Sequence, residues 1–255
     1  MPSLPKSLVA LLLLVIVPRA SEAKNAGEYL TDAKDYALAP LHWTPEQWEW
    51  AAGATASVAT AYAFDGRVRS HFADASTSPS GDPHSLRDAA PAIALTLGTL
   101  AYGFVRDDAT VRSTGEDMVE AVALGALSSF AMKAALGRTR PDSTSSRSAW
   151  GSGGDSFPSG HVTGAFAAAQ VFADSRPPGD WAWRALAYSL AGLTAYARVN
   201  DNMHWTSDVV AGAALGIATG RFVSNREGRT HRSPVTLWVQ PLQRGAMLSF
   251  AIDPP

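Results

Sequence analysis

The amino-acid sequence predicts an all-α fold, a helical bundle of about six core helices with a small β-hairpin at the C-terminal end. Three observations favour this fold class. Six apolar stretches have lengths suited to helices, they are rich in Ala and Gly, and they contain few β-branched residues. The stretches span residues 51–64, 89–105, 118–136, 161–173, 183–196 and 209–223.

Polar segments separate these stretches. An aromatic and polar segment, residues 29–50, precedes the first stretch. Two long polar links follow, residues 65–88 and residues 142–157, and the second is rich in Ser and Gly. Such composition is typical of loops between helices, so we expect both links to be irregular.

The C-terminal tail has a different pattern. Residues 235–239 and 247–252 are β-prone and flank a Gln243-Arg244-Gly245 turn, which predicts the hairpin. We therefore expect one helical domain over residues 24–230, with its active-site motifs at residues 133–208, and a separate tail over residues 231–255.

Composition narrows the classes of function. The chain has 255 residues, of which 46% are hydrophobic and 17% charged, so it can bury a substantial core and is apolar for a soluble protein. The formal net charge of −2 provides no basic field for nucleic acid. Because the chain has no cysteine, it can form neither disulfides nor thiolate metal sites.

The N-terminus predicts export. Lys6 precedes an apolar run at residues 8–17, and Ser21-Glu22-Ala23 offers small residues at the positions of a cleavage site. The run is shorter than the ~20 residues of a typical membrane span, which favours a cleaved signal peptide over residues 1–23 rather than a retained anchor. We expect a protein of the periplasm or cell envelope.

Three short motifs carry the chemistry: residues 133–141 (KAALGRTRP), 158–161 (PSGH) and 198–208 (RVNDNMHWTSD). Lys133, Arg140 and Arg198 provide the fixed positive charge that a phosphoryl group needs in its ground state and more strongly in its transition state. Ser159 and Gly160 lie just before a predicted helix, where backbone N–H groups and the helix N-terminus would form an anion cradle.

His204 and Asp208 are four residues apart, which places both side chains on one face of a helix if the helix begins there. A carboxylate at that position can hold an imidazole in one tautomer and stabilise its cation, so the other ring nitrogen becomes a usable nucleophile. Taken singly, these residues have ordinary explanations, such as a helix cap for Asp208. Their joint order and spacing favour a composite site.

The motifs resemble those of the type 2 phosphatidic acid phosphatase superfamily, which includes bacterial acid phosphatases, lipid phosphatases and vanadium haloperoxidases. Lys133 is followed by six residues and Arg140-Pro141, and Arg198 by five residues, His204, three residues and Asp208. The resemblance covers residues 133–221. One departure is Ala197, where the family motif usually has Ser.

The resemblance implies a mechanism without metal or other cofactor. His204 would attack phosphorus to give a phosphohistidine, and Asp208 would orient it. His161 would protonate the leaving alkoxide and later activate water. Phosphate would be bound by Lys133, Arg140, Ser159, Gly160 and Arg198.

The resemblance also implies a phosphorylated small-molecule or lipid substrate. We expect a phosphatase acting on phosphomonoesters or pyrophosphates, such as phosphatidate or undecaprenyl pyrophosphate. The alternatives are a soluble periplasmic acid phosphatase of broad specificity, a vanadium haloperoxidase, and a non-enzymatic envelope protein. The sequence makes no prediction about oligomeric state.

The location of the bundle stays open at the level of sequence. The stretches are dominated by Ala and shorter than most spans, which favours a soluble bundle. If all six crossed a membrane after a cleaved signal peptide, the loop carrying Arg140 would face the cytoplasm, whereas membrane relatives usually work on the outer face. Residues 137–141 and 207–212, however, look more like lipid-phosphatase members. We expect an exported protein that is either soluble in the periplasm or associated with the inner membrane, in the second case with the active site on its outer face.

Overall fold

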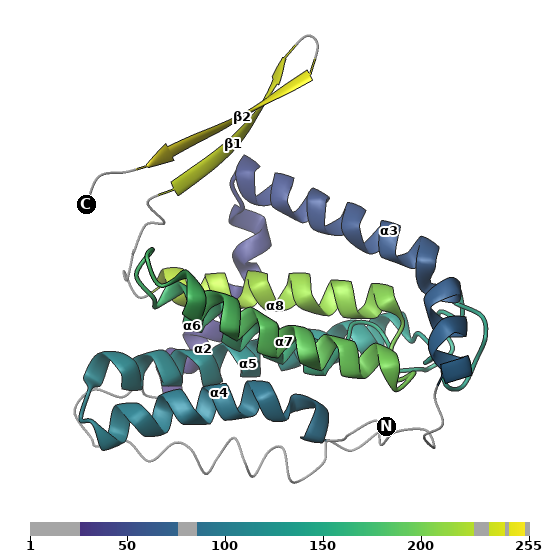
Figure 1. Cartoon of the computed structure of the whole chain (residues 1–255), viewed down its shortest axis with the longest axis horizontal. Helices are drawn as coiled ribbons and strands as arrows, with labels where there is room; N and C mark the ends of the chain where they lie inside the picture. Colours follow the sequence, from purple (N-terminus) through teal and green to yellow (C-terminus); the bar gives the residue numbers. More distant parts are fainter. Residues whose placement is uncertain (1–25, 76–85, 227–234, 243–244, 253–255) are drawn as a thin grey trace. The chain divides into compact units, whose positions relative to one another are not determined.

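The computed structural model describes residues 26–75, 86–226, 235–242 and 245–252. Within residues 26–226 the described chain is all-helical, with seven α-helices. The predicted signal peptide, residues 1–23, lies outside the described residues. Residues 1–43 and 44–255 form two separate units, each described here by itself. The helices of both units are shown in Figure 1.

The first unit contains α2 (Ala26–Leu38) and a short 3-10 helix, η1 (Ala39–His42). The second contains α3 (Pro45–Ala75), α4 (Leu86–Val105), α5 (Ala109–Leu136), α6 (Gly160–Asp174), α7 (Trp181–Asn200) and α8 (Thr206–Arg226). Each of the six predicted apolar stretches lies inside one of the helices α3 to α8, which confirms the helical prediction for all six.

The polar link at residues 65–88, which was predicted to be irregular, is partly helical, and that prediction was wrong. Helix α3 continues to Ala75, through the first half of the polar link at residues 65–88, and α2 occupies part of residues 29–50. Both segments contain good helix formers such as Ala and Arg or Lys, and their polar side chains mask the apolar periodicity from which helices are recognised. Residues 142–157 are irregular, as predicted.

Helix α6 is at the centre of the second unit and packs against α4, α5, α7 and α8. Ten of its 15 residues are buried, seven of them Ala or Val. Helices α4 and α5 form an adjacent pair joined by a short turn (Figure 1). Asp108 caps α5 there, because its carboxylate accepts the backbone N–H groups of Thr110 and Val111 at 3.0 and 3.1 Å.

Helices α6 and α8 pack in parallel and unusually closely. Gly212, Gly216 and Gly220 recur at every fourth position of α8 and therefore lie on one face. A Cβ on these glycines would lie 2.7, 2.4 and 2.7 Å from the carbonyl oxygens of residues 159, 163 and 167, respectively. Those three residues are also spaced four apart, at the start of α6 and along it. The two helices thus run in the same direction with their N-termini side by side.

Beyond the helices, β1 (Val235–Leu242) and β2 (Gly245–Ile252) pair antiparallel, from Val235 opposite Ile252 to Leu242 opposite Gly245. The predicted turn residues Gln243 and Arg244 lie outside the described residues.

Two helices satisfy the length and composition criteria for a membrane span. They are residues 87–105 of α4 and residues 109–136 of α5, with mean hydropathies of 1.3 and 1.4. Only about a third of each is buried within the protein. The interior helix of a soluble protein meets the same criteria, so these two helices alone do not define a membrane topology.

The close contact between α6 and α8 predicts opposite effects for two Gly→Ala substitutions. Gly216→Ala should lower the free energy of unfolding by about 1 to 3 kcal/mol, because the new methyl group meets the backbone of α6. Gly192→Ala in α7 is the matched control, since nothing lies within 4 Å of its Cβ position. It should raise stability by roughly 0.5 to 1 kcal/mol. Denaturant unfolding measures both values, and equal effects would contradict the packing described.

Candidate active site

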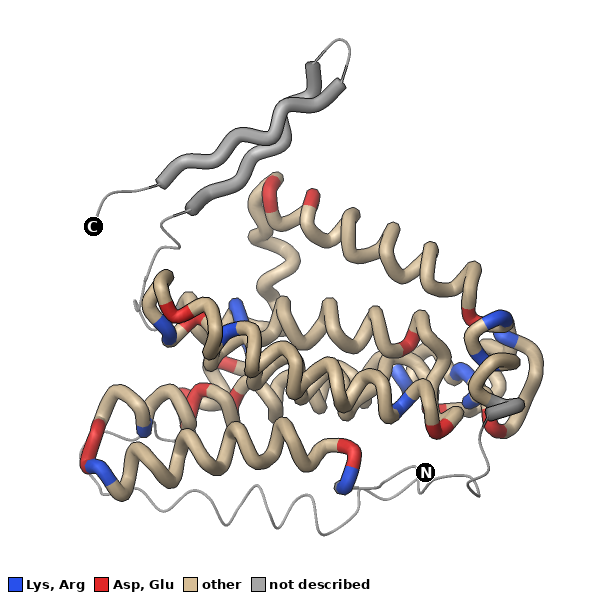
Figure 2. Tube along the Cα trace, viewed as in Figure 1, with Lys and Arg blue, Asp and Glu red and all other residues tan. Residues whose placement is uncertain are grey.

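The site is built where four helix ends and one loop meet. Lys133 is in the last turn of α5, Arg198 in the last turn of α7, and Gly160 begins α6. Asp208 is in the first turn of α8. The loop between α5 and α6 adds a further cation, Arg140. Figure 2 shows that charged residues lie mainly at helix ends, with long uncharged segments between them.

The structure brings the predicted residues together through direct contacts. The backbone N–H of Ser159 donates to the carbonyl oxygen of Asp208 at 3.0 Å, and that of His204 to the carbonyl oxygen of Arg198 at 3.2 Å. A Cβ on Gly160 would lie 3.9 Å from Cε of Lys133. The two N-termini of α6 and α8 therefore face the three cations, together with His161, the second residue of α6.

The loop at residues 137–159 is fixed by the backbone. Gly137 ends α5 with a left-handed φ of 56°, which allows its N–H to bond the carbonyl oxygen of Lys133. The indole of Trp205 donates to the carbonyl oxygen of Thr139 at 2.9 Å. The backbone N–H of Ser156 donates to the carbonyl oxygen of Arg138, also at 2.9 Å. These bonds hold the loop against the start of α8.

Two carboxylates that the sequence analysis did not identify hold the cations. Arg140 forms a two-pronged ion pair with Asp155, at 2.7 and 2.8 Å, and Nζ of Lys133 donates to the carbonyl oxygen of the same residue. Arg198 is buried and donates to Asp88 of α4 at 2.7 Å. Both acids lie in segments predicted as polar links, where nothing in the local sequence distinguishes them from solvated residues.

His204 is buried, with Nδ1 3.7 Å from a carboxylate oxygen of Asp208. The four-residue spacing suggested a helix that contains both His204 and Asp208, but α8 begins only at Thr206, so His204 precedes it. Nδ1 of His204 and Oγ of Ser159 are buried and have no hydrogen-bond partner among the described residues.

The two histidines of the site, His204 and His161, have pKa values low enough to be neutral at neutral pH. Burial, and then the charges of Lys133 and Arg140, hold the pKa of His204 well below its usual value of 6.5. Burial and the charge of Arg198 lower the pKa of His161 to about 4. A neutral imidazole keeps a free lone pair, so each histidine can accept a proton or attack an electrophile.

Asp208 is surrounded by donors. Its carboxylate accepts hydrogen bonds from Arg138 at 2.5 Å, from Ser156 at 2.5 Å and from the backbone of Trp205 at 2.9 Å. Burial raises the pKa of Asp208, while Arg138 and these bonds act against the rise. Arg138 and its second partner, Asp65, were likewise not identified from the sequence. Arg138 is one of the six residues between Lys133 and Arg140, and the motif does not define the identity of those residues.

The arrangement suits a tetrahedral oxyanion rather than a metal ion. Among the described residues, no group of three or more His, Asp or Glu side chains is placed to hold a metal. Three cations and two helix N-termini instead surround neutral imidazoles. This combination can bind an anion and attack its central atom.

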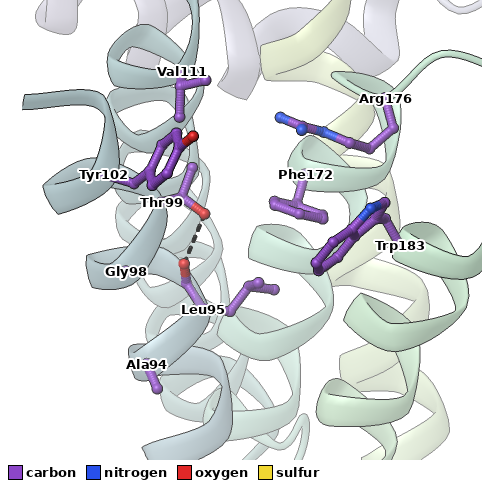
Figure 3. Close-up of a pocket in the computed structure, with 9 residues that line it drawn as sticks. All are labelled: Ala94, Leu95, Gly98, Thr99, Tyr102, Val111, Phe172, Arg176 and Trp183. Carbon is purple, nitrogen blue, oxygen red and sulfur yellow. Dashed lines mark hydrogen bonds between the residues drawn. The ribbon is translucent and has the colours of Figure 1, made fainter. Parts of the chain in front are cut away.

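A separate cavity lies between α4 and the end of α6 (Figure 3). It has a volume of about 290 Å³ and contains none of the predicted site residues. Tyr102 and Val111 face Arg176, Phe172 and Trp183 across it. Phe172 and Arg176 lie at or just past the C-terminal end of α6, whereas the site is built at its N-terminal end.

Two comparisons with known proteins identify relatives. Residues 117–231 match the model of the PAP2 superfamily. The lipid A 1-phosphatase of Porphyromonas gingivalis is 42% identical over 92 residues, which cover 34% of this chain and 18% of that protein. The chain thus spans less than a fifth of the length of this curated relative. No solved structure matches the chain.

The matched residues contain all eight predicted site residues, from Lys133 to Asp208. The resemblance inferred from the three motifs is therefore confirmed, because residues 117–231 of this chain match the PAP2 superfamily.

Proposed function

We propose that this protein is a metal-independent phosphatase that hydrolyses phosphomonoesters or pyrophosphates through a phosphohistidine intermediate. The observation that carries the proposal is a buried neutral imidazole, His204, whose pKa is depressed by burial and then by three surrounding cations, and whose Nδ1 lies 3.7 Å from Asp208. Such a group is a poor base for solvent protons but a good nucleophile toward an anion that the cations hold in place.

Substrate binding requires an exchange of partners. Nε and Nη2 of Arg140 already donate to the carboxylate of Asp155. A phosphoryl group that takes these donors must displace Asp155, whose side chain is half exposed and can turn toward water. Lys133, Arg198 and the N-terminus of α6 would complete the binding of the phosphoryl oxygens.

The chemical step follows from the position of Asp208. Because Nδ1 of His204 is on the side of Asp208, Nε2 is the nitrogen that attacks phosphorus. A bound phosphoryl dianion offsets the charge of the cations, so His161 takes up a proton in the substrate complex. The N–P bond forms as the bond to the leaving oxygen breaks, and protonated His161 donates its proton to that oxygen. Neutral His161 then takes a proton from water, which attacks phosphorus, displaces His204 and releases phosphate. Asp208 stabilises the imidazolium form of His204 throughout.

We favour a lipid phosphate as substrate and a location in the cell envelope. The named relative is a lipid A 1-phosphatase, and it is 42% identical to this chain over 92 residues. Helices α4 and α5 are apolar and largely unburied within the protein, which suits contact with a membrane. The export signal predicted at residues 1–23 agrees with an active site outside the cytoplasm.

Assays of purified protein with soluble esters, phosphatidate and undecaprenyl pyrophosphate test this function. We expect turnover that resists EDTA and is inhibited by vanadate, with higher kcat/KM for the lipid phosphates. His204→Asn should lower kcat by several orders of magnitude, on the order of 10⁴-fold or more, because the covalent route is lost. An acid-labile phosphoenzyme should be trapped with the unaltered chain only. Activity that is lost in EDTA and restored by a divalent metal would contradict the mechanism.

The pH dependence of kcat and of kcat/KM should show whether His161 is the general acid. In the free protein, burial and Arg198 lower the pKa of His161 to about 4, so the proton it must donate is lost as pH rises through that range. A bound phosphoryl dianion offsets the charge of the cations and raises this pKa. The base limb of kcat should therefore lie at higher pH than the base limb of kcat/KM. His161→Asn is the control, because it removes the imidazole while the substrate still titrates as before. If the base limbs of kcat and kcat/KM coincide in the unaltered protein, His161 is not the general acid.

Competition by Asp155 predicts tighter anion binding when its charge is removed. Asp155→Asn should improve vanadate affinity up to about fivefold, near 1 kcal/mol, because a partly exposed ion pair with Arg140 no longer opposes the ligand. Asp142→Asn is the matched control, since Asp142 is an exposed acid of the same loop that contacts Ser143. Weaker binding by Asp155→Asn would mean that Asp155 orients Arg140 for the ligand instead.

A further inference from the structure

Arg138 is a fully buried cation held between two carboxylates. Its guanidinium donates to Asp208 at 2.5 Å and to Asp65 at 2.7 Å, and both acids are as completely buried as Arg138 itself. It also donates to Oγ of Ser207 at 2.7 Å and to the carbonyl oxygen of Arg147 at 2.8 Å. Arg138 thus contacts the carboxylate that faces His204, and it makes no contact with the three phosphate-binding cations proposed above.

Asp65 ties this arrangement to α3. One of its oxygens accepts the backbone N–H of Ser207 at 2.8 Å, and the other accepts Oγ of Ser207 at 2.6 Å. Ser207 is the neighbour of Asp208 in the first turn of α8. A single carboxylate from far earlier in the chain therefore fixes both Arg138 and the backbone next to Asp208.

Aromatic rings exclude water from the guanidinium. The rings of Tyr62, Trp150 and Trp205 lie 5.2, 4.6 and 5.2 Å from Cζ of Arg138. Attraction between charges is much stronger in such surroundings than in water. The electrostatic effect of Arg138 on Asp208 is accordingly little screened.

We propose that Asp65, Arg138 and Asp208 form a buried chain of alternating charge in which Arg138 is a positioning residue that keeps Asp208 ionised and directed at His204. This inference rests on the proposed function, because it gives Asp208 its role beside the nucleophile. Stability alone is a weak explanation for such a chain, since buried ion pairs often contribute little net stability after the cost of desolvation.

The charges around Asp208 determine the expected direction of change. Burial raises the pKa of Asp208 and Arg138 lowers it, while Lys133 of α5 and His204 are the other titratable groups near it. Removal of the positive charge of Arg138 should raise the pKa of Asp208. Removal of the negative charge of Asp65 should have the opposite effect, because Arg138 then interacts with Asp208 alone.

Activity profiles of Arg138→Gln, Arg138→Lys and Asp65→Asn test the proposal. Arg138→Gln should lower kcat on the order of a hundredfold and move the acid limb of kcat/KM to higher pH. Asp65→Asn should move that limb to lower pH, and Arg138→Lys should restore part of kcat. Vanadate affinity should stay the same in all three, since the phosphate-binding cations are unchanged.

Arg147→Gln is the matched control. The Arg147 side chain donates to the carbonyl oxygens of Tyr62 and Ala63 at 3.1 and 2.8 Å and stacks on the same Tyr62 ring, but it contacts no carboxylate. It should leave the acid limb in place.

A second measurement does not depend on turnover. A raised pKa of folded Asp208 means that the folded state binds more protons than the unfolded state, so stability falls as pH rises. The decrease in Tm caused by Arg138→Gln should therefore grow as pH rises above 3.8, the ordinary pKa of an Asp carboxyl, whereas the decrease caused by Arg147→Gln should not. If the unaltered protein hydrolyses no phosphoester, the proposed function fails while this measurement still decides the charge chain.

The outcomes separate clearly. Acid limbs that stay in place or shift the same way in Arg138→Gln and Asp65→Asn would overturn the proposal, as would a pH-independent decrease in Tm. Loss of vanadate affinity in step with kcat would place Arg138 in phosphate binding instead. If Arg138→Gln does not fold, Arg138→Lys and Asp65→Asn decide the question, and an unshifted acid limb in Asp65→Asn would reject it.

Discussion

The parallel contact between α6 and α8 is the constraint on which the site depends. Two helices that run in the same direction present two positive ends at one place, an arrangement that is electrostatically unfavourable unless negative charge is nearby. Glycines on α8 allow the backbones to approach until Ser159 donates to the carbonyl oxygen of Asp208. The carboxylate of Asp208 lies in the first turn of α8, where it offsets part of this positive field.

Carboxylates from separate elements distribute the remaining charge. Asp88 of α4 pairs with Arg198, Asp155 of the loop with Arg140, and Asp65 of α3 with Arg138. These pairs differ in exposure. Asp88 and Asp65 are buried, so their partners are fixed, whereas Asp155 is half exposed and its partner can be shared with a ligand. An Arg paired with an Asp is therefore held in place at the two buried positions and is free to exchange its partner at the third.

The sequence indicated the helices and the candidate site residues more readily than the acids that contact them. Short-range spacing pointed to Lys133, His161, Arg198 and His204 as candidates. Asp65 and Asp88 escaped because their partners lie 73 and 110 residues away, a separation at which no local pattern indicates contact. Helix α3 was predicted too short because its last turns are polar. Asp65 resembles the first residue of a polar link in the sequence, and only its contact with the buried Arg138 shows that it belongs to the packed helix.

The placement of Asp65 and Asp88 has a consequence for how the domain is delimited. The superfamily match begins at residue 117, after both acids, although each binds an arginine at the site. A fragment cut at that boundary would expose α6 and leave Arg198 without Asp88 and Arg138 without Asp65. The smallest autonomous unit that can carry this site must therefore include α3, so the segment recognisable by its motifs is shorter than the segment that must fold together.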